Sequence, residues 1–333
     1  MGLGAHGEAS KVKALRDLEG QIEAAGEPTI AVVLPCCNEG KTIARVVEDF
    51  RRYLPSATIY VYDNNSSDET VAEARRAGAV VRQEAMQGKG FVVRRALAQI
   101  EADVLVLADG DGTYDAAAAP ELVNLLCVQQ LDMVVGVREP VEQEAYPSGH
   151  QFGNRLFNAI VTWLFGKGFR DIFSGYRVLS RPFVKSFPSI ARGFEIETEI
   201  SVHALQLGLP TAEVVTAYGK RREGTASKLR TYQDGASILL TILRLLRHQR
   251  PFLMFGVIAL ISALLSVTIG EPIIAEFLRT GLVPRLPSAV LAASLMVIAV
   301  IAFVTGIILD SVAHAAEEQK RLFYLSVSRR RQK

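Results

Sequence analysis

The sequence predicts a parallel α/β domain followed by a pair of membrane-spanning helices. Short β-rich runs alternate with longer amphipathic stretches over residues 29–137, which is the rhythm of a parallel sheet with helical crossovers. Two long apolar stretches, residues 252–269 and 289–309, lie near the C-terminus. The composition supports the membrane part, because 49% of the 333 residues are hydrophobic and the mean hydropathy is +0.21. The chain is therefore more apolar than a soluble enzyme needs.

The α/β pattern defines five strands and four helices. We expect strands at residues 29–34, 58–62, 79–82, 104–108 and 133–137. The helices expected between them cover residues 42–53, 69–77, 91–100 and 120–129. In sheets of this kind ligands bind beyond the carboxyl ends of the strands, so the turns that follow the strands are the candidate site.

Three polar turns follow these strands, at residues 35–40, 63–68 and 109–113. Their carboxylates, Glu39, Asp63, Asp109 and Asp111, would repel one another unless a cation or the hydroxyls of a ligand lay between them. Hard oxygen ligands suit Mg²⁺ or Mn²⁺, so Asp109-Gly110-Asp111 predicts a divalent ion bound to a diphosphate. Taken alone, this triplet fits a solvated turn equally well, and Ser66 to Glu69 fits a helix-capping box.

The two apolar stretches have the length of membrane spans. They contain 18 and 21 residues without a charge, close to the roughly 20 residues that cross a bilayer core. Two buried core helices are the alternative. Basic residues precede the first span and follow the second, whereas the loop between them holds only Arg279 and Arg285. Positive-inside bias then places both termini in the cytoplasm.

The remaining composition fits a cytoplasmic domain on a membrane anchor. Residues 1–28 show no apolar core of signal-peptide type. The three cysteines, Cys36, Cys37 and Cys127, lack metal-ligand spacing, and their odd number fits reduced thiols better than a set of disulfides. The net charge of +2 is unremarkable, and we expect no nucleic-acid partner. The expected organisation is an N-terminal extension (1–28), an α/β domain (29–233), a juxtamembrane amphipathic helix (234–251), two spans (about 252–271 and 288–309 within 252–310) and a basic tail (311–333).

Five motifs in order give the chain a resemblance to a known family. They are Pro35-Cys36-Cys37-Asn38-Glu39, Asp63-Asn64-Asn65-Ser66-Ser67-Asp68-Glu69-Thr70, Asp109-Gly110-Asp111, Phe173-Ser174-Gly175-Tyr176-Arg177 and Arg221-Arg222-Glu223-Gly224-Thr225-Ala226-Ser227-Lys228-Leu229. Together they resemble family-two glycosyltransferases, specifically the polyprenyl-phosphate glycosyltransferases related to dolichol-phosphate mannose synthase and bactoprenol glucosyltransferase. The likeness covers about residues 29–233, and the following pair of spans matches the bactoprenol type.

The resemblance implies a GT-A fold, a mostly parallel α/β sheet that binds nucleotide-diphosphate sugars, followed here by the C-terminal two-helix transmembrane hairpin. It implies transfer of a sugar, with inversion, from a nucleotide-diphosphate sugar (UDP preferred) to a polyprenyl phosphate such as undecaprenyl phosphate, at the inner membrane. In the family the first motif and the Asp of the second hold the nucleotide, which corresponds here to Pro35, Cys37, Glu39 and Asp63. The Asp-x-Asp motif places Asp109 and Gly110 beside the nucleotide and Asp111 on the metal; Asp109 is a further metal candidate, and both aspartates are expected to act in catalysis. Lys89, in the turn Gly88-Lys89-Gly90, could contact the donor phosphate, but a tight helix entry explains these glycines equally well. Thr113 stands where some relatives supply a further ligand, often Gln, and is a weaker metal candidate. Related enzymes suggest a homo-oligomer, a tetramer.

The acceptor phosphate needs cations, because charge-assisted hydrogen bonds would draw it to the anomeric carbon. The candidates are Arg138, Arg177, Arg221, Ser227 and Lys228, with Lys228 also expected to act in catalysis. Three acids, Glu195, Glu197 and Glu199, either orient a sugar hydroxyl or an arginine, or are exposed residues of a first helical turn.

Three other functions fit parts of the sequence less well. A processive polysaccharide synthase shares the fold but usually carries a Gln-x-x-Arg-Trp segment, and Trp163, the single tryptophan, has no such context. A nonenzymatic membrane scaffold or transporter subunit is a further alternative, although the spans lack polar runs that would line a pore. A nucleotidyltransferase would need a glycine-rich triphosphate loop that is not found near the first strand. The sugar itself is not fixed by the sequence.

Overall fold

The computed structural model describes residues 27–140, 162–163, 168–189, 191, 193, 195–219 and 250–329. The chain forms two compact units. One, here called the sheet unit, comprises residues 1–228 together with 321–333. The other, the hairpin unit, comprises residues 229–320.

The sheet unit is built on a seven-stranded sheet with the strand order β3-β2-β1-β4-β6-β5-β7. Every pair is parallel except those of β6, which runs antiparallel to both β4 and β5. The strands are β1 (Ile30–Cys36), β2 (Thr58–Asp63), β3 (Val80–Gln83), β4 (Val104–Leu107), β5 (Met133–Pro140), β6 (Arg177–Ser180) and β7 (Thr211–Tyr218).

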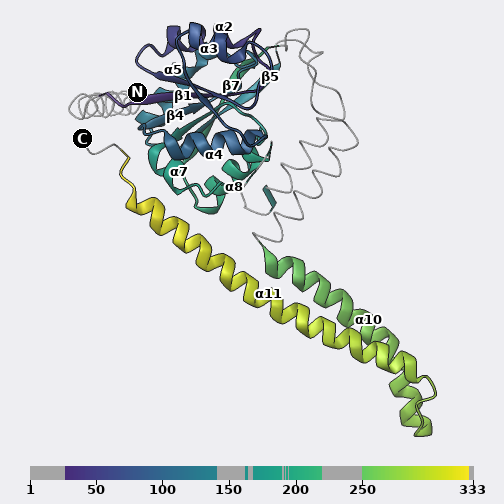
Figure 1. The fold of residues 1–333 in the computed structure, drawn as a ribbon. Coiled ribbons are helices and arrows are strands. Elements are labelled where there is room, and N and C mark those ends of the chain that lie inside the picture. Colours follow the sequence, from purple (N-terminus) through teal and green to yellow (C-terminus); the bar gives the residue numbers. More distant parts are fainter. Residues whose placement is uncertain are drawn as a thin grey trace, which may run out of the picture. The chain divides into compact units, whose positions relative to one another are not determined.

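Helices cover both faces of this sheet. Figure 1 shows α2, α3 and α5 on one face and α4, α7 and α8 on the other. Their bounds are α2 (Ile43–Tyr53), α3 (Thr70–Arg76), α4 (Lys89–Gln99), the 3-10 turn η1 (Ala116–Ala118), α5 (Ala119–Val128), α7 (Arg181–Ser186) and α8 (Ile196–Gln206). Because both faces are covered, the central strand β4 is buried at all four positions and reads as a continuous apolar run.

The apolar periodicity of the helices fixes which side each one buries. In α2 the buried residues Ile43, Val46, Val47 and Phe50 follow the spacing of one helical face, while Arg51 and Arg52 point to solvent. Phe50 packs edge-on against Tyr176, with ring centroids 6.4 Å apart. This packing brings the segment just before β6 into the core beneath α2.

The five expected strands and four expected helices of residues 29–137 are all confirmed, with ends that differ by at most three residues. Strands β6 and β7 were not predicted. β6 has only four residues, too few for a period to be recognised, and it enters the sheet antiparallel between two strands that precede it in sequence. The fold is therefore a mostly parallel GT-A-like α/β sheet with one reversed strand.

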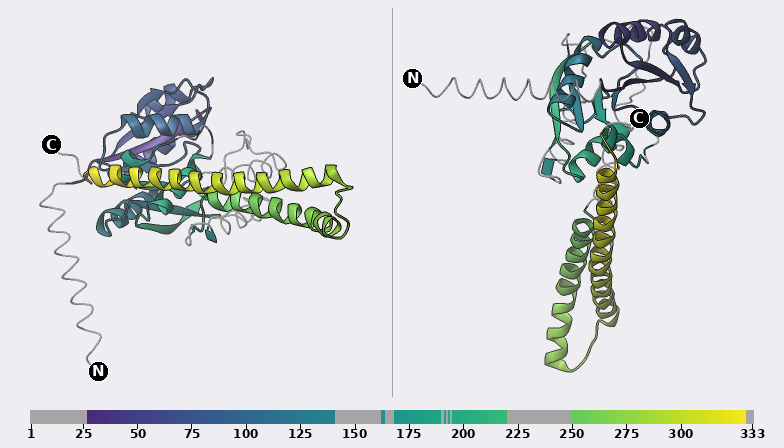
Figure 2. Two further views of the ribbon diagram at one scale, coloured as in Figure 1. Left: turned by 90° about the horizontal axis from the view of Figure 1, so that it is seen from below. Right: turned by 90° about the vertical axis from the view of Figure 1, so that its left-hand side faces the viewer.

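The hairpin unit contains two long helices, each long and apolar enough to cross a membrane by length and composition. They are α10 (Pro251–Thr280) and α11 (Leu286–Ser326), and the predicted spans lie within them. Figure 2 shows the two helices running alongside each other. The last residues of α11, from Arg321 onward, belong to the sheet unit.

Small side chains form the contact between α10 and α11. The buried positions are mostly Ala, Ser and Gly, namely Ala259, Ser262, Ser266, Ala292, Ala299, Ala302 and Gly306, whereas most of the large apolar side chains are exposed. Gly306 lies against Phe255, so that a Cβ added there would be 3.2 Å from the Phe255 Cβ. Close approach of small residues is how helices associate when the surroundings are as apolar as the side chains.

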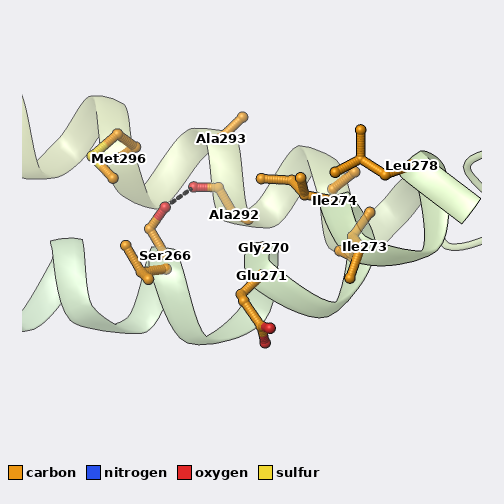
Figure 3. Close-up of a pocket in the computed structure, with 12 residues that line it drawn as sticks. Ser266, Gly270, Glu271, Ile273, Ile274, Leu278, Ala292, Ala293 and Met296 are labelled. Atoms are coloured by element: carbon orange, nitrogen blue, oxygen red, sulfur yellow. Dashed lines mark hydrogen bonds between the residues drawn. The ribbon is translucent and has the colours of Figure 1, made fainter.

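A groove of about 570 Å³ opens between the two helices (Figure 3). Its lining is mostly apolar and includes Met296, with Glu271 as its one charged residue. Two of the lining residues connect the helices, since the Ser266 hydroxyl donates a 2.7 Å hydrogen bond to the carbonyl of Ala292 on the other helix. Pro272 lies inside α10, between the lining residues Glu271 and Ile273 in sequence.

Several expected segments lie outside the described residues. These are residues 1–26 of the N-terminal extension, residues 234–249 of the juxtamembrane helix, and the boundary expected at residue 233. The basic tail is described up to Arg329, and α11 continues into it as far as Ser326.

Candidate functional site

The three polar turns meet at the carboxyl ends of β1, β2 and β4. In the register of the sheet Cys36 pairs with Asp63, and Val33 pairs with Leu107. The backbone N–H of Asn64 continues the ladder by donating to the carbonyl of Cys36 at 2.8 Å. Pro35 therefore lies near the end of β1, and Cys37 and Glu39 follow it, between the end of β2 at Asp63 on one side and the end of β4, which Asp109 follows, on the other.

The first two turns are joined by reciprocal hydrogen bonds. The side-chain oxygen of Asn38 accepts from the N–H of Ser67 at 2.8 Å, and the Ser66 hydroxyl accepts from the N–H of Asn38 at 2.9 Å. The N–H of Glu39 donates to the Thr70 hydroxyl at 2.8 Å. Ser66 thus braces the neighbouring turn, and the alternative of a capping box with Glu69 is wrong, since α3 begins at Thr70 with no side-chain bond from Glu69.

Asn38 and Asn65 each adopt a left-handed backbone, with φ of 59°. Asparagine enters this region more readily than most residues, which explains its presence in both turns. The side-chain amide of Asn65 donates to the carbonyl of Ala85 at 2.8 Å, and that of Asn64 donates to the carbonyls of Glu84 and Met86. The second turn therefore also fixes the loop that leads into α4.

The third turn is held against the first by Gly110. Its carbonyl accepts a 2.9 Å hydrogen bond from the Thr42 hydroxyl. A Cβ at Gly110 would lie 2.3 Å from the Cys36 sulfur, closer than any real contact, so only glycine fits. The Asp111 Oδ1 accepts from both the backbone N–H of Thr113, at 3.1 Å, and its hydroxyl, at 2.6 Å. Thr113 thus orients Asp111.

The resulting edge carries a concentration of negative charge. Burial, followed by the nearby carboxylates of Glu39, Asp109, Asp63 and Asp111, raises the pKa of the Cys36 thiol well above its ordinary value. The Oδ1 atom of Asp63 is buried without a hydrogen-bond partner among the described residues. Within the described part of the chain no three carboxylate, histidine or cysteine side chains converge on one point. A divalent cation such as Mg²⁺ or Mn²⁺ could therefore be held here only by one or two carboxylates together with the phosphates of a nucleotide, which is a usual arrangement for Mg²⁺.

Lys89, at the first residue of α4, is bound between two carboxylates. Its ammonium group pairs with Asp109 and lies 2.6 Å from Glu197 Oε1. The position is set by Asn64, whose side-chain oxygen accepts from the N–H of Gly88 at 2.7 Å. Burial acts against the charge of Lys89, but the two carboxylates outweigh it, so the pKa of Lys89 lies above its ordinary value and the side chain stays charged.

Glu197 is the site residue that sequence reasoning placed least well. It lies in the first turn of α8, as expected for an acid there, but its side chain is buried and not exposed. Its Oε2 atom is buried without a hydrogen-bond partner among the described residues. Burial raises the pKa of Glu197 although Lys89 opposes this. No local pattern pointed to this burial, because α8 mixes acids and apolar residues around its circumference.

The motif at residues 173–177 closes the site from the side of β6. A Cβ on Gly175 would lie 3.1 Å from an oxygen of Asp109, 3.2 Å from the ammonium nitrogen of Lys89 and 3.2 Å from the Tyr114 hydroxyl. The N–H of Gly175 donates to that hydroxyl at 2.8 Å. Glycine here allows the backbone to approach the charged pair directly.

Two arginines expected at the acceptor side have well-defined partners. Arg177 is fully buried, and its guanidinium donates to the carbonyls of Ser174 (2.9 Å) and Ile172 (2.8 Å). Burial lowers the pKa of Arg177 to about 10, and this environment favours a structural role. Arg138 forms a bidentate pair with Asp171, at 2.7 and 2.8 Å, and lies over the ring of Tyr218. Asp171 already balances its charge, which weakens the argument for a phosphate ligand.

The remaining acceptor candidates, Arg221, Ser227 and Lys228, lie outside the described residues. Cys37 is half-buried at the carboxyl end of β1, where its sulfur accepts a hydrogen bond from the side-chain amide of Gln87 at 3.7 Å. The structure thus brings together Cys37, Glu39, Asp63, Lys89, Asp109, Gly110 and Asp111 at one edge.

Comparison with known proteins gives consistent results. The family described as Glycosyl transferase family 2 matches residues 31–187. Glycosyltransferase AglJ of Haloferax volcanii is 34% identical over 235 residues, which cover 70% of this chain and 77% of AglJ. The dolichyl-phosphate hexose transferase of the same organism is 28% identical over 66% of this chain and 95% of its own length.

The fold also matches a solved structure. Glucosyl-3-phosphoglycerate synthase from Mycobacterium tuberculosis, in complex with Mn²⁺, uridine diphosphate and glucosyl-3-phosphoglycerate, superimposes with a TM-score of 0.55 at 23% identity. The alignment covers 71% of this chain and 83% of that protein. At this level of identity the likeness establishes the fold.

Proposed function

Because the chain belongs to glycosyltransferase family 2 and is a glycosyltransferase, we propose that it transfers a sugar from a nucleotide-diphosphate sugar to a polyprenyl phosphate. We prefer a UDP-sugar as donor and undecaprenyl phosphate as acceptor, with inversion at the anomeric carbon. The observation that carries the proposal is the meeting of Glu39, Asp63, Asp109 and Asp111 at one edge of the sheet, beside the buried pair of Lys89 and Glu197.

The donor would lie along the edge formed by the first three turns. Pro35, Cys37, Glu39 and Asp63 would hold the nucleoside, and the unsatisfied Oδ1 of Asp63 offers an acceptor for a hydroxyl or an imino N–H of that ligand. The bracing bonds between Asn38, Ser66 and Ser67 hold these groups in place before the donor arrives. Such preorganisation reduces the ordering cost of binding. A solved protein of the same fold carries UDP in its structure, which supports this choice of donor.

Asp109 and Asp111 would hold a divalent ion, Mg²⁺ or Mn²⁺, which when bound supplies a Lewis acid for the negative charge that builds on the leaving diphosphate. Thr113 orients Asp111 through two hydrogen bonds and is a positioning residue in this arrangement, with a weaker case as a ligand. Gly110 keeps the two aspartates close to β1, since no larger residue fits there.

Glu197 would bind the donor sugar. Its Oε1 is occupied by Lys89, while its buried Oε2 is unsatisfied among the described residues and would accept a sugar hydroxyl. A buried carboxylate of this kind discriminates strongly between sugars, because a donor lacking the hydroxyl leaves the oxygen unpaired. Lys89, charged and buried, balances Asp109 and Glu197 and holds both in place.

The acceptor requires cations and no strong base. A lipid phosphate has a second pKa near 6 and is largely dianionic at neutral pH, so it can attack the anomeric carbon directly. Arg221, Ser227 and Lys228 would bind this phosphate, with Arg138 as a weaker contributor. A relative whose name states that it acts on dolichyl phosphate supports a lipid acceptor.

The protein would act at the inner membrane. The two long apolar helices suggest membrane association. The basic residues that flank them favour both termini in the cytoplasm, with the sheet unit on that side. By resemblance we propose a homo-oligomer, such as a tetramer.

A transfer assay tests the proposal. Full-length protein in detergent is mixed with undecaprenyl phosphate, Mn²⁺ or Mg²⁺ and radiolabelled nucleotide sugars, and the label in a lipid-soluble monosaccharide product is counted. Asp111→Asn should lower the turnover at least about 100-fold, because the charge that holds the metal is removed while the shape of the side chain remains.

Glu48→Gln is the matched control. It removes one carboxylate from the exposed face of α2 and should leave turnover unchanged. Near-normal turnover of Asp111→Asn, or a polymeric product from the wild type, would contradict the proposal.

A further inference from the structure

Asp132 is a fully buried carboxylate far along β5 from the site. It immediately precedes β5, while Arg138 lies near the other end of that strand. Its backbone is fixed on both sides, since its N–H donates to the carbonyl of Pro210 at 2.8 Å and its carbonyl accepts from Ser180 at 3.0 Å. The backbone of Asp132 is thus bonded to the last residue of β6 and to the residue before β7.

Most of the hydrogen bonds that satisfy this carboxylate come from the C-terminal segment. The Tyr324 hydroxyl donates to Oδ2 at 2.8 Å, and the Arg329 guanidinium donates to Oδ1 at 3.1 Å. Within the rest of the sheet unit, the Ser180 hydroxyl donates to Oδ1 at 2.6 Å. A buried carboxylate left with this hydroxyl alone would be strongly destabilising, because its charge would be unpaired.

Two further contacts hold the same segment in place. The second nitrogen of the Arg329 guanidinium donates to the carbonyl of Leu131 at 3.0 Å. Arg181, at the start of α7, donates to the carbonyl of Ser328 at 3.0 Å. The guanidinium of Arg329 is therefore bound by a carboxylate and a carbonyl at once, which fixes its orientation.

Polar contacts and not apolar burial hold the segment. Around Tyr324 the large apolar side chains face away, with Leu322 68%, Phe323 54% and Leu325 68% exposed. A helix end that docked by the hydrophobic effect would turn these residues inward. Tyr324 faces inward instead, which makes the attachment specific for Asp132.

We propose that residues 321–329 are a docking segment, and that the buried carboxylate of Asp132 is the receptor for its Tyr324 and Arg329. The partner of this surface is the C-terminal segment of the same chain. The docking segment follows the hairpin unit in the sequence, so the sheet unit is built from residues on both sides of that unit in the chain. The docking segment then contributes to the folding stability of the sheet unit.

A double-mutant cycle on the full-length protein tests the docking. We expect Arg329→Gln to lower the thermal midpoint by about 5 °C or more, because the buried carboxylate loses its charged partner. In an Asp132→Asn background the same substitution should change the midpoint by about 1 °C or less, since no charge remains to be paired. Hydrogen exchange of the C-terminal peptide should increase in both single variants.

Arg321→Gln is the matched control, because it removes a positive charge from the exposed side of the same segment. Equal effects of Arg321→Gln and Arg329→Gln would overturn the proposal. So would an Arg329→Gln effect that is the same in the wild-type and Asp132→Asn backgrounds. The thermal midpoint is also compared at two protein concentrations. If the midpoint of the wild type falls on dilution while that of Arg329→Gln does not, the segment docks on a second copy of the chain, and docking within one chain is overturned.

Discussion

The two units of the molecule bury opposite kinds of residue. The sheet unit buries ionisable side chains in its interior, among them Lys89, Arg177 and Glu197, each with polar partners. The hairpin unit buries Ala, Ser and Gly between α10 and α11 and leaves most of its large apolar side chains exposed.

The difference is the one expected if the sheet unit folds in water and the hairpin unit in a bilayer, which its two long apolar helices suggest. In water, large apolar residues gain by burial, and a few buried charges are maintained where they are paired. In a bilayer, a leucine gains nothing by leaving lipid for protein, so helices associate through close packing of small residues and through interhelical hydrogen bonds. Substitutions of one type should therefore have very different effects in the two units.

The largest effect is expected in the sheet unit, from Lys89→Met. The substitution leaves the carboxylates of Glu197 and Asp109 without their shared cation and should lower the free energy of unfolding by about 3–5 kcal/mol. Denaturant unfolding of the full-length protein measures this loss.

The double variant Lys89→Met with Glu197→Gln sharpens the test. Removing the charge of Glu197 should restore a large part of the stability. It should not restore the transfer activity, because Glu197 is proposed to bind the sugar and Lys89 to hold Asp109 in place, and both are still substituted. A double variant that is less stable than Lys89→Met alone would show that the pair does not interact as the structure indicates.

An intermediate effect is expected in the hairpin unit, from Gly306→Leu. The new side chain would meet Phe255 and Phe252 and force the helices apart, at a cost of about 1–3 kcal/mol. The thermal midpoint in detergent or lipid discs measures it. Val300→Leu, which adds one methylene to an exposed position of the same helix, should leave the midpoint unchanged; equal shifts in the two variants would argue against the small-residue interface.

The smallest effect is expected from Ser266→Ala. It removes the hydrogen bond to the carbonyl of Ala292 and should cost about 0.6 kcal/mol, the average for such bonds between membrane helices. Ser294→Ala is the matched control, since the Ser294 hydroxyl bonds to Val290 within its own helix. A cost above that of Gly306→Leu would reverse the order expected for the hairpin.

The sequence predicted the parts of the fold that have a clear period. The five strands and four α-helices that the structure describes from residue 29 to β5 were predictable from alternating apolar runs, and so were the two long apolar helices, whereas the 3-10 turn η1 was not predicted. β6 was not predictable, because its four residues are too short to show a period and its place between β4 and β5 depends on tertiary pairing. The burial of Arg177 was not predictable for the same reason, because Arg177 is the first residue of this strand.

The candidate site was predictable where residues lie at strand ends. Glu39, Asp63, Asp109 and Asp111 meet because parallel strands end at one edge. The partners of Lys89 were not predictable, since Glu197 is 108 positions away in a helix whose burial depends on the whole second half of the sheet unit. Local pattern alone made Glu197 an ordinary acid of a first helical turn.

The contact between Gly110 and Cys36 has a consequence for how such sequences can evolve. The sulfur of Cys36 fills the space that a side chain at position 110 would need, so the two positions are not free to vary independently. A homologue with a bulkier residue at position 36 must retain glycine at 110. Alanine at 110 becomes tolerable only after position 36 has itself become small, so the order of the two mutations matters to a lineage.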